Sequence, residues 1–248
     1  MEGSKLLDCA LDAGASVEAV YIGAGALASP GVREVLERAI EAGARGFELA
    51  PGVLEKVADT VTPQPVLAVV RTPEALIDDI AQSDLVVVCE DVRDPGNAGA
   101  LIRSADASGV GGVVCCEGTV DPFNPKTVRA SAGSVLHLPV VTGLGIADVM
   151  TWLASKDFAL RGAVSEGGVP HTDVDWSRRS AIILGNEATG LSDELRPRLD
   201  ELVTVVMPGR AESLNVAIAG AVLCFEALRQ RSTLARMRNA DNDENRVG

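Results

Sequence analysis

The first 70 or so residues alternate between short apolar segments and polar breaks, with both helical and strand periodicity. Apolar positions at helical spacing predict two longer helices, and period-two patterns predict strands between them. The expected helices are 5–12, Gly31–Ala42 and Pro51–Asp59, and the expected strands are Val17–Ile22, Phe47–Leu49 and Val66–Val70. Pro63, Pro65 and Pro73 then interrupt the pattern, so residues 1–72 are predicted to form a small α/β domain.

The pattern changes after residue 80, where near-continuous apolar runs of strand length alternate with segments of helix length. Such runs are buried on both faces, which is typical of a parallel sheet covered by helices. The runs are Leu85–Cys89, Gly112–Cys116, Phe158–Val164, Ala181–Leu184 and Leu202–Met207. A last helix with a wide apolar face is expected to begin near Ser213. We therefore predict a second α/β domain at residues 80–232 and a flexible, acidic tail at 233–248.

Composition narrows the class of protein. No apolar run approaches the about 20 residues that span a bilayer, and the start lacks a secretory pattern, so we expect a cytoplasmic protein without a membrane segment. The five cysteines show no CxxC pairing and are expected to be buried thiols, and His137 and His171 are not spaced as metal ligands. A net charge of −13 opposes nucleic-acid binding unless the basic residues cluster.

Three loops follow apolar strands in the second domain and carry the chemistry-bearing residues. The first leads from Asp91 to Arg103, with Asn97 as the expected helix N-cap and Arg103 off the buried stripe. The second follows Leu184 and has a carboxylate and an amide between two glycines, and the third precedes the helix expected at Ser213. In an open parallel sheet, ligands bind beyond the carboxyl ends of the strands. Each loop taken alone is also consistent with an ordinary capped turn.

Taken in order, the three loops resemble the three motifs of the SpoU/TrmH family of RNA ribose methyltransferases, in the SPOUT class. The matching pieces are Asn97-x-Gly99-x-x-x-Arg103, then Leu184-Gly185-Asn186-Glu187-x-x-Gly190-Leu191, then Met207-Pro208-Gly209-Arg210-Ala211-Glu212-Ser213-Leu214-Asn215-Val216. The segment from Asp121 to Gly133 also looks like the stretch between the first two motifs. The N-terminal unit resembles the ribosomal-protein-like RNA-binding domain of many members.

The resemblance implies a parallel sheet with a C-terminal trefoil knot, a homodimer, and methyl transfer from S-adenosylmethionine to a ribose 2′-hydroxyl. The acceptor is expected to be rRNA rather than tRNA, and no metal is implied. The implied cofactor-binding residues are Leu184, Gly185, Asn186, Gly190, Val205, Met207 and Leu214. The implied catalytic residues are Arg103, Asn97, Glu187, Ser213 and Asn215, and the implied RNA-binding residues are Lys126, Arg129 and Arg210.

The role of Arg103 is the least settled part of this assignment. Family members assign it the removal of the hydroxyl proton, but a guanidinium, with a pKa above about 12, is a poor base at neutral pH. Binding of the RNA phosphate and stabilisation of the developing alkoxide are the alternative. The chain also departs from the family in reading Val205-Val206-Met207 before the third motif, and in starting at Met1 where a basic segment and a strand are usual. We expect that first strand to be missing.

Two other interpretations fit parts of the sequence. Gly23-Ala24-Gly25 follows a predicted strand and suggests a Rossmann-type nucleotide-binding enzyme, although the glycine pattern is incomplete. The acidic charge and the short start suggest a catalytically inactive RNA-binding or ribosome-assembly factor on the same fold. Binding of S-adenosylmethionine but not of dinucleotides distinguishes the first alternative, and methyl transfer distinguishes the second.

Overall fold

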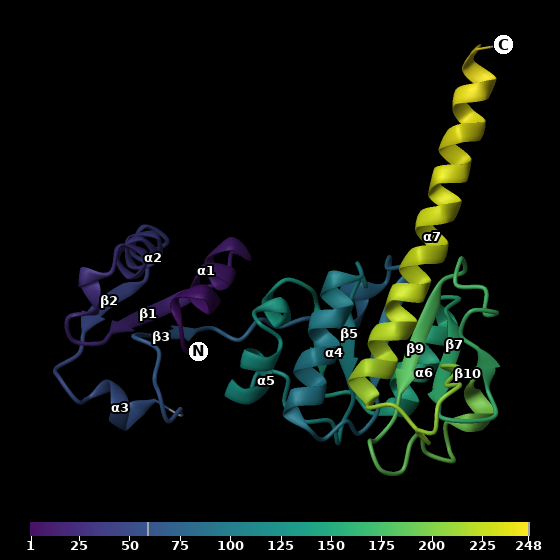
Figure 1. The fold of residues 1–248 in the computed structure, drawn as a ribbon, viewed down its shortest axis with the longest axis horizontal. Helices are drawn as coiled ribbons and strands as arrows, with labels where there is room; N and C mark the ends of the chain where they lie inside the picture. Colours follow the sequence, from purple (N-terminus) through teal and green to yellow (C-terminus); the bar gives the residue numbers. More distant parts are fainter. Residues whose placement is uncertain (59, 248) are drawn as a thin grey trace.

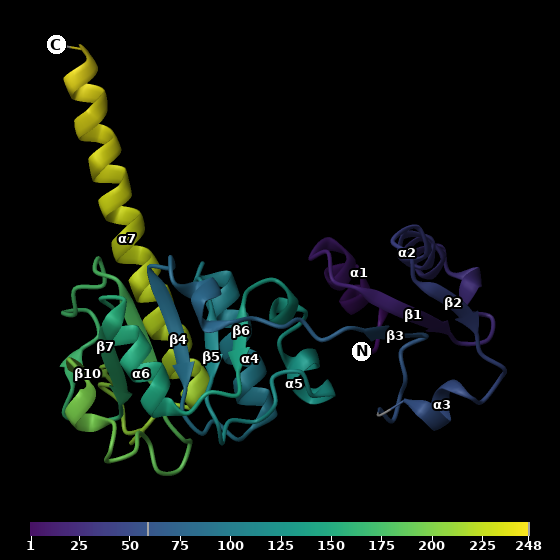
Figure 2. The ribbon, with the colours of Figure 1, turned by 180° about the vertical axis from the view of Figure 1, so that it is seen from behind.

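The computed structural model describes residues 1–58 and 60–247, with side chains up to residue 237. The chain forms two separate sheets, connected by residues 71–76, which are neither helix nor strand. The sheets lie side by side, and the last helix projects away from the second one (Figure 1). Seen from behind, the connecting segment is a single stretch of coil that runs between the two sheets (Figure 2).

The first sheet has three strands in the order β2-β1-β3. Strands β1 and β2 are parallel, whereas β1 and β3 are antiparallel. The strands are β1 (Val17–Ile22), β2 (Arg45–Glu48) and β3 (Val66–Val70), and the helices are α1 (Ser4–Asp12), α2 (Pro30–Glu41) and α3 (Leu54–Val57). Val20 and Ile22 are buried with Val35 of α2, so the two longer helices cover one face of this sheet. At its edge, Glu2 forms an antiparallel bridge with Leu67.

The predicted elements of this unit are present, with shifted bounds. The strand predicted at Phe47–Leu49 begins two residues earlier, at Arg45. The helix predicted at Pro51–Asp59 is only the short α3, because Pro51 and Gly52 form a turn before it. Asp59, the predicted end of that helix, lies outside the described residues.

The second sheet has seven strands in the order β6-β5-β4-β9-β7-β10-β8, and all of its pairings are parallel. Its strands are β4 (Leu85–Cys89), β5 (Val113–Cys115), β6 (Val140–Thr142), β7 (Ala159–Val164), β8 (Val169–Pro170), β9 (Ser180–Leu184) and β10 (Glu201–Thr204). Its helices are α4 (Pro95–Ala107), α5 (Pro125–Ala130), α6 (Ile146–Ser155) and α7 (Val216–Val247). Short 3₁₀ turns are η1 (Ala26–Ala28), η2 (Ile77–Ile80), η3 (Ser134–Leu136) and η4 (Arg196–Arg198).

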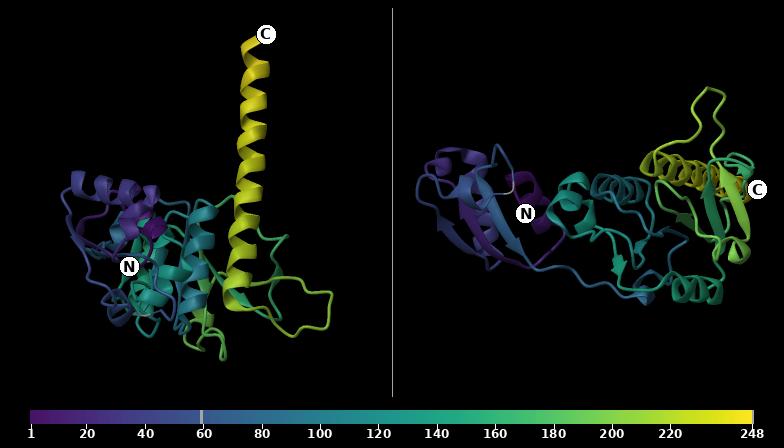
Figure 3. Two further views of the ribbon diagram at one scale, coloured as in Figure 1. Left: turned by 60° about the vertical axis from the view of Figure 1, so that its left-hand side comes forward. Right: turned by 90° about the horizontal axis from the view of Figure 1, so that it is seen from below.

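Helices cover both faces of this sheet, as the continuous apolar runs predicted. Neighbouring residues along a strand point to opposite faces, and Val87 and Val88 accordingly belong to different cores. One core contains Leu101 of α4 and Leu223 of α7, and the other contains Leu153 of α6. The view from below shows the helices lying on the two sides of the sheet (Figure 3).

Several element bounds in this unit differ from the predicted ones. The last helix begins at Val216 rather than near Ser213, and its helical residues continue to Val247, into the segment predicted as a tail. The strand predicted at Leu202–Met207 ends at Thr204, and the two short strands β6 and β8 were not predicted. Strands this short produce no recognisable period, and unlike the three-residue β5 neither lies in an apolar run that was recognised as a strand.

The five cysteines are free thiols, and all except Cys9 are buried. Among the described helices, none combines the length and the apolar character that crossing a bilayer requires.

The strand order explains how distant loops come together. The chain moves outward from β4 to β5 and β6, and later returns to place β9 directly beside β4. Strand β7 lies on the other side of β9, and β10 follows it. Because these strands are parallel, the loops that follow β4, β7, β9 and β10 emerge at one edge of the sheet.

Candidate active site

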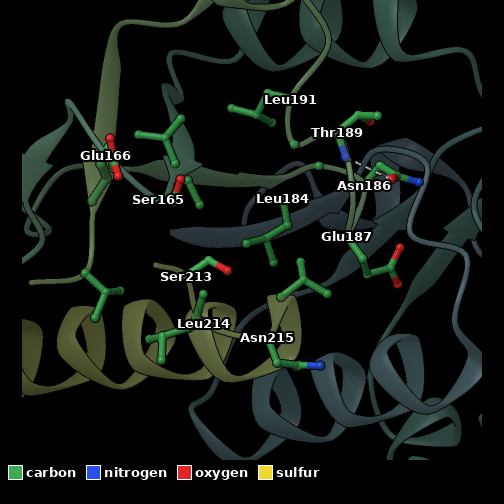
Figure 4. Close-up of a pocket in the computed structure, with 18 of the residues that line it drawn as sticks. Ser165, Glu166, Leu184, Asn186, Glu187, Thr189, Leu191, Ser213, Leu214 and Asn215 are labelled. Carbon is green, nitrogen blue, oxygen red and sulfur yellow. Dashed lines mark hydrogen bonds between the residues drawn. The ribbon is translucent and has the colours of Figure 1, made fainter. Parts of the chain in front are cut away.

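A cavity of about 710 Å³ lies at this edge of the second sheet. The loop after β9, the end of β7 and the segment that connects β10 to α7 form its walls (Figure 4). It contains all seven residues predicted to bind the cofactor and four of the five predicted catalytic residues. They are Leu184, Gly185, Asn186, Gly190, Val205, Met207 and Leu214, together with Asn97, Glu187, Ser213 and Asn215.

The first turn of α4 positions Asn97. Asp94 is the N-cap of this helix, since its carboxylate accepts a hydrogen bond from the backbone N–H of Asn97 at 2.8 Å. The prediction that Asn97 is itself the cap is therefore wrong. Pro95 at the first helical position also favours a helix start at Asp94. The cap by Asp94 leaves the Asn97 side chain available for other contacts.

Glu187, in the loop after β9, accepts hydrogen bonds from the loop after β4. Its carboxylate accepts from the Asn97 Nδ2 at 2.9 Å, from the backbone N–H of Asp94 at 3.1 Å and from that of Arg93 at 3.2 Å. Partial burial acts to raise the pKa of Glu187, but the hydrogen bonds from Asn97 and from backbone N–H groups outweigh it. The pKa therefore lies below its usual value near 4.5.

Asn215 connects the third loop to the same group. Its Nδ2 donates to the Asn97 Oδ1 at 2.8 Å, while its own Oδ1 accepts from the backbone N–H groups of Ala217 and Ile218 at 2.9 and 3.3 Å. Asn215 thus caps α7, which begins at the next residue, Val216. The Ser213 hydroxyl is directed into the pocket (Figure 4).

Two close contacts shape the loop after β9. The backbones of Asn186 and Gly190 pair in both directions, at 2.9 and 3.0 Å, and close the loop against Gly185. A Cβ at Gly185 would lie 2.3 Å from the carbonyl carbon and oxygen of Gly190. The Asn186 side chain faces away from the pocket, since its Nδ2 donates to Asp91. Asn186 therefore supports the shape of the loop rather than offering its side chain to a ligand.

The packing of α4 against α5 explains why the first motif has a glycine at position 99. A Cβ at Gly99 would lie 2.5 Å from the Ala130 Cβ and 2.6 Å from the Thr127 carbonyl oxygen, both on α5. Only glycine allows α4 and α5 to approach this closely without a shift of the backbone.

The structure does not bring Arg103 into this group. Arg103 is exposed on α4 and is not among the residues that line the cavity, and its side chain forms no hydrogen bond or ion pair with any other described residue. Lys126 and Arg129 lie on α5, and Arg210 lies in the segment before α7; all three are exposed and outside the cavity. Within the described part of the chain, no group of three or more His, Cys, Asp or Glu residues is arranged to hold a metal ion.

The sequence interpretation missed four polar residues of the cavity: Ser165, Glu166, Thr189 and Arg196. Ser165 and Glu166 directly follow β7, which was predicted as a strand. The rule that ligands bind beyond the carboxyl ends of parallel strands could have identified them. Glu166 lies at the opposite end of the cavity from Glu187 (Figure 4). Its carboxylate has no hydrogen-bond or ion-pair partner among the described residues.

Replacement of Asn97 by Asp tests the electrostatics of the site. Asn97→Asp removes a donor to Glu187 and places a second carboxylate beside it, so we expect a free energy of unfolding lower by about 1–2 kcal/mol at pH 7. The difference should shrink as the pH falls toward 4, because one of the two carboxyl groups takes up a proton. In the wild-type protein, the pKa of Glu187 is lower in the folded state than in the unfolded state. Ionised Glu187 therefore contributes to the free energy of unfolding above pH 4.5, and this contribution is lost as the pH falls through the folded-state pKa. Chemical denaturation at several pH values measures both trends.

Asn124→Asp is the matched control. Asn124 caps α5 by accepting from the backbone N–H groups of Lys126 and Thr127, a role that Asp performs equally well. Asn124→Asp should leave the free energy of unfolding unchanged or slightly higher at pH 7. Its difference from the wild type should not become more favourable as the pH falls. If both variants showed the same free energy of unfolding at every pH, the Asn97–Glu187 contact would make no electrostatic contribution to stability.

Comparison with protein families identifies two segments of the chain. Residues 84–225 match the SpoU rRNA methylase family, and residues 1–68 match the MRM3-like substrate binding domain. The first match includes all three loops around the cavity. The second covers the three-stranded sheet and its helices.

Known proteins are similar over most of the chain. The 23S rRNA (guanosine(2553)-2′-O)-methyltransferase RlmP of Bacillus subtilis is 35% identical over 217 residues, which cover 84% of this chain and 86% of that protein. The SpoU methyltransferase AviRb of Streptomyces viridochromogenes, solved with AdoMet, aligns with a TM-score of 0.83 and 31% identity over 94% of this chain and 90% of AviRb. An AdoMet-bound rRNA methyltransferase of Sinorhizobium meliloti aligns with a TM-score of 0.82 and 32% identity over 92% and 86% of the two chains.

Proposed function

The chain belongs to the SpoU rRNA methylase family, and on that premise we propose that it methylates a ribose 2′-hydroxyl of ribosomal RNA with S-adenosylmethionine as the methyl donor. One observation carries this proposal. The hydrogen-bonded series Glu187, Asn97, Asn215 joins three loops that are far apart in sequence around a single cavity. These are the loops that hold the three motifs of the family.

The residues of the cavity fit S-adenosylmethionine. Its volume of about 710 Å³ is within the range of small-molecule sites, about 300–1,000 Å³. Leu184, Met207 and Leu214 supply apolar surface for a flat base and methylene groups, and Glu166 and Glu187 supply negative charge for a cationic ligand. When bound, the cofactor supplies a methyl group on a positively charged sulfur, which is already a good electrophile.

The protein must then align the ribose hydroxyl and assist the loss of its proton. The hydrogen bonds of Asn97 with Glu187 and with Asn215 hold the three loops in fixed positions relative to one another. The Ser213 hydroxyl, directed into the cavity, is available to bind either reactant. Arg103, two turns further along α4 than Asn97, would bind the RNA phosphate and stabilise the negative charge that develops on the 2′-oxygen.

Ribosomal RNA is the proposed acceptor because the similar proteins from Bacillus subtilis and Sinorhizobium meliloti are named as rRNA methyltransferases. The Rossmann-type alternative finds no support. Gly23 and Gly25 lie in the first unit, after β1, and do not line the cavity. The inactive-factor alternative has no specific observation in its favour, since the residues of all three motifs are present.

Two further features complete the proposal. We propose that the C-terminal chain is threaded as a trefoil knot, supported by the likeness to SpoU structures and by the meeting of the loops after β7, β9 and β10 around one cavity. We also propose that residues 1–72 bind the RNA substrate, supported by the match to a substrate binding domain.

A homodimer is proposed through the exposed side of α7. Its Ile218 and Phe225 are 55% and 47% exposed, and with Leu228 they form an apolar stripe on one side of the helix. The opposite side is buried against α4 and β9.

Phe225→Glu should therefore weaken self-association about 100-fold or more, because it places a charge at the centre of an apolar contact. Analytical ultracentrifugation over a range of concentrations measures the change. Val61→Glu, at a fully exposed apolar residue outside this stripe, should behave as the wild type. A wild-type protein that sediments as a monomer at all concentrations would contradict the proposal.

Transfer of the methyl group from labelled S-adenosylmethionine to ribosomal RNA tests the proposed function directly. We expect label in RNA, at one or a few nucleotides whose 3′ phosphodiester bonds resist alkaline hydrolysis. Arg103→Ala should still bind the cofactor but transfer little. If the wild type and Arg103→Ala both transfer nothing while binding RNA, the protein is an inactive binding factor. Binding of dinucleotides in place of S-adenosylmethionine would support the Rossmann interpretation.

A further inference from the structure

The open face of the three-stranded sheet carries an aromatic pair, formed by the exposed Phe47 and the half-buried Tyr21. Tyr21 and Phe47 are cross-strand partners, and their rings stack at 5.3 Å between centroids with an interplanar angle of 17°. The Arg45 guanidinium lies 6.0 Å from the centroid of the Phe47 ring, which is itself 42% exposed. The chain has only four phenylalanines, two tryptophans and one tyrosine. Two of these rings therefore lie together on a surface where they contribute little to a core.

The register shows that these side chains share one face. Gly46, between Arg45 and Phe47, faces α2, because a Cβ there would contact Leu36 and Ile40. Arg45 and Phe47 consequently point away from the helices. On β3, Leu67 pairs with Tyr21, so the row Phe47, Tyr21, Leu67 crosses the whole sheet. We refer to this row as the aromatic track.

The aromatic track leads into a second cavity, of about 380 Å³, which lies between the three-stranded sheet and α5 of the second domain. Tyr21, Leu67 and Val69 form its wall on the sheet, and Val128 and Arg129 form the wall on α5. The lining is largely apolar, and its charged groups are the Arg129 guanidinium, the Met1 ammonium group and the Glu2 carboxylate. The surface thus places flat rings, an apolar recess and a positive charge next to one another.

The charges around the track favour an anionic ligand despite the acidic composition of the chain. Lys126 and Arg129 are exposed, and their side chains have no hydrogen-bond or ion-pair partner among the described residues. Two nearby carboxylates keep their negative charge but accept hydrogen bonds from neutral groups. Glu2, which also lines the cavity, accepts from Thr60 and from the backbone of Gln64, and Glu48 accepts from the backbone of Gly25.

We propose that the aromatic track and the adjoining cavity bind unpaired nucleotides of the RNA substrate. One base stacks on the Phe47–Tyr21 pair, a neighbouring base enters the cavity, and Lys126 and Arg129 bind the phosphates between them. Aromatic rings and guanidinium planes are the surfaces on which proteins stack the bases of single-stranded RNA, whereas bases in a duplex are not available for such contact. This inference rests on the proposed function, since it assigns the substrate contact to a specific surface.

Binding of a short fluorescein-labelled single-stranded RNA to the full chain, measured by fluorescence anisotropy, tests the inference. Phe47→Leu and Tyr21→Leu keep apolar volume but remove the ring, and each should weaken binding about 5- to 100-fold. Phe47→Tyr and Tyr21→Phe keep the ring and should bind within about twofold of the wild type. Ile40→Ala, at a 50% exposed apolar residue on α2, is the control on the opposite face.

Three more measurements locate the contact. Arg129→Ala should reduce the slope of log affinity against log salt by about one, as expected for a lost phosphate contact. Photo-crosslinking with 4-thiouridine in the same RNA should label the peptides that contain Tyr21 or Phe47. A duplex of the same sequence should bind more weakly and show no difference between the ring-removing and ring-keeping variants.

The outcomes separate this inference from the proposed function. If wild type and all variants methylate rRNA but the Leu variants bind single-stranded RNA as tightly as the wild type, the track is not the binding surface. If the Leu variants lose binding of an apolar peptide and not of RNA, the surface is a protein contact and the inference is wrong. If the wild type neither binds RNA nor transfers a methyl group, the proposed function itself fails.

Discussion

Gly185→Ala is expected to abolish measurable binding of S-adenosylmethionine, with a dissociation constant at least about 100-fold higher. The added Cβ would lie 2.3 Å from the carbonyl of Gly190 and 2.5 Å from the backbone nitrogen of Leu191. These are backbone atoms, which cannot move aside as the end of a flexible side chain can. The loop must open, and the paired hydrogen bonds between Asn186 and Gly190 are then lost.

The same strain should lower stability by about 2–3 kcal/mol, which corresponds to a melting temperature lower by about 4–12 °C. Isothermal titration with S-adenosylmethionine and thermal denaturation measure the two effects. Gly31→Ala is the matched control, because a Cβ at Gly31 meets nothing within 4 Å. Unchanged cofactor affinity in Gly185→Ala would show that the loop after β9 does not form the cofactor site.

Arg103→Ala should lower the rate of methyl transfer by about 10²- to 10⁴-fold while leaving the affinity for S-adenosylmethionine within about twofold. The two effects separate because Arg103 is exposed, lies outside the cavity and has no partner among the described residues. Its removal therefore leaves the loops around Asn97 and Glu187 in place. What is lost is a positive charge for the RNA phosphate and for the developing charge on the 2′-oxygen.

Arg103→Lys distinguishes the role of the charge from that of the guanidinium geometry. Lysine keeps the charge but not the planar, bidentate donor set, so we expect an intermediate rate. Single-turnover kinetics at saturating cofactor, combined with calorimetric cofactor binding, measure both quantities. Arg236→Ala, an exposed arginine on α7, should match the wild type. A large loss of cofactor affinity in Arg103→Ala would instead place Arg103 in the cofactor site.

Much of the second domain is predictable from local sequence. The runs at Leu85–Cys89 and Ala181–Leu184 are apolar without interruption, and a strand buried on both faces requires this. The three loops follow such strands, and the motif residues within them occur in the order that the family shows. From these features alone, most residues that line the cavity could be assigned, apart from Ser165 and Glu166 after β7 and Arg196 in η4.

Local sequence did not determine which residue performs each contact. Asp94, Pro95 and Asn97 all suit a helix start, and only the fold shows that Asp94 caps α4 and that Asn97 is thereby free to bridge Glu187 and Asn215. Gly99 was recognised only as a position of the first motif, and the structure shows that it allows the close approach of α5. Such choices depend on neighbours from other parts of the chain.

The sequence by itself therefore determined the class of fold, the order of the three loops and the identity of most residues around the cavity, because burial and turn formation depend on neighbouring residues along the chain. The tertiary structure decided which loops meet, that Ser165 and Glu166 join them, and that Arg103 lies outside the cavity. It also decided that Tyr21 and Phe47 form one exposed surface beside Arg129. These relations depend on strand order and register, which join residues as far apart as Asn97 and Asn215, 118 positions, and leave no local periodic signal.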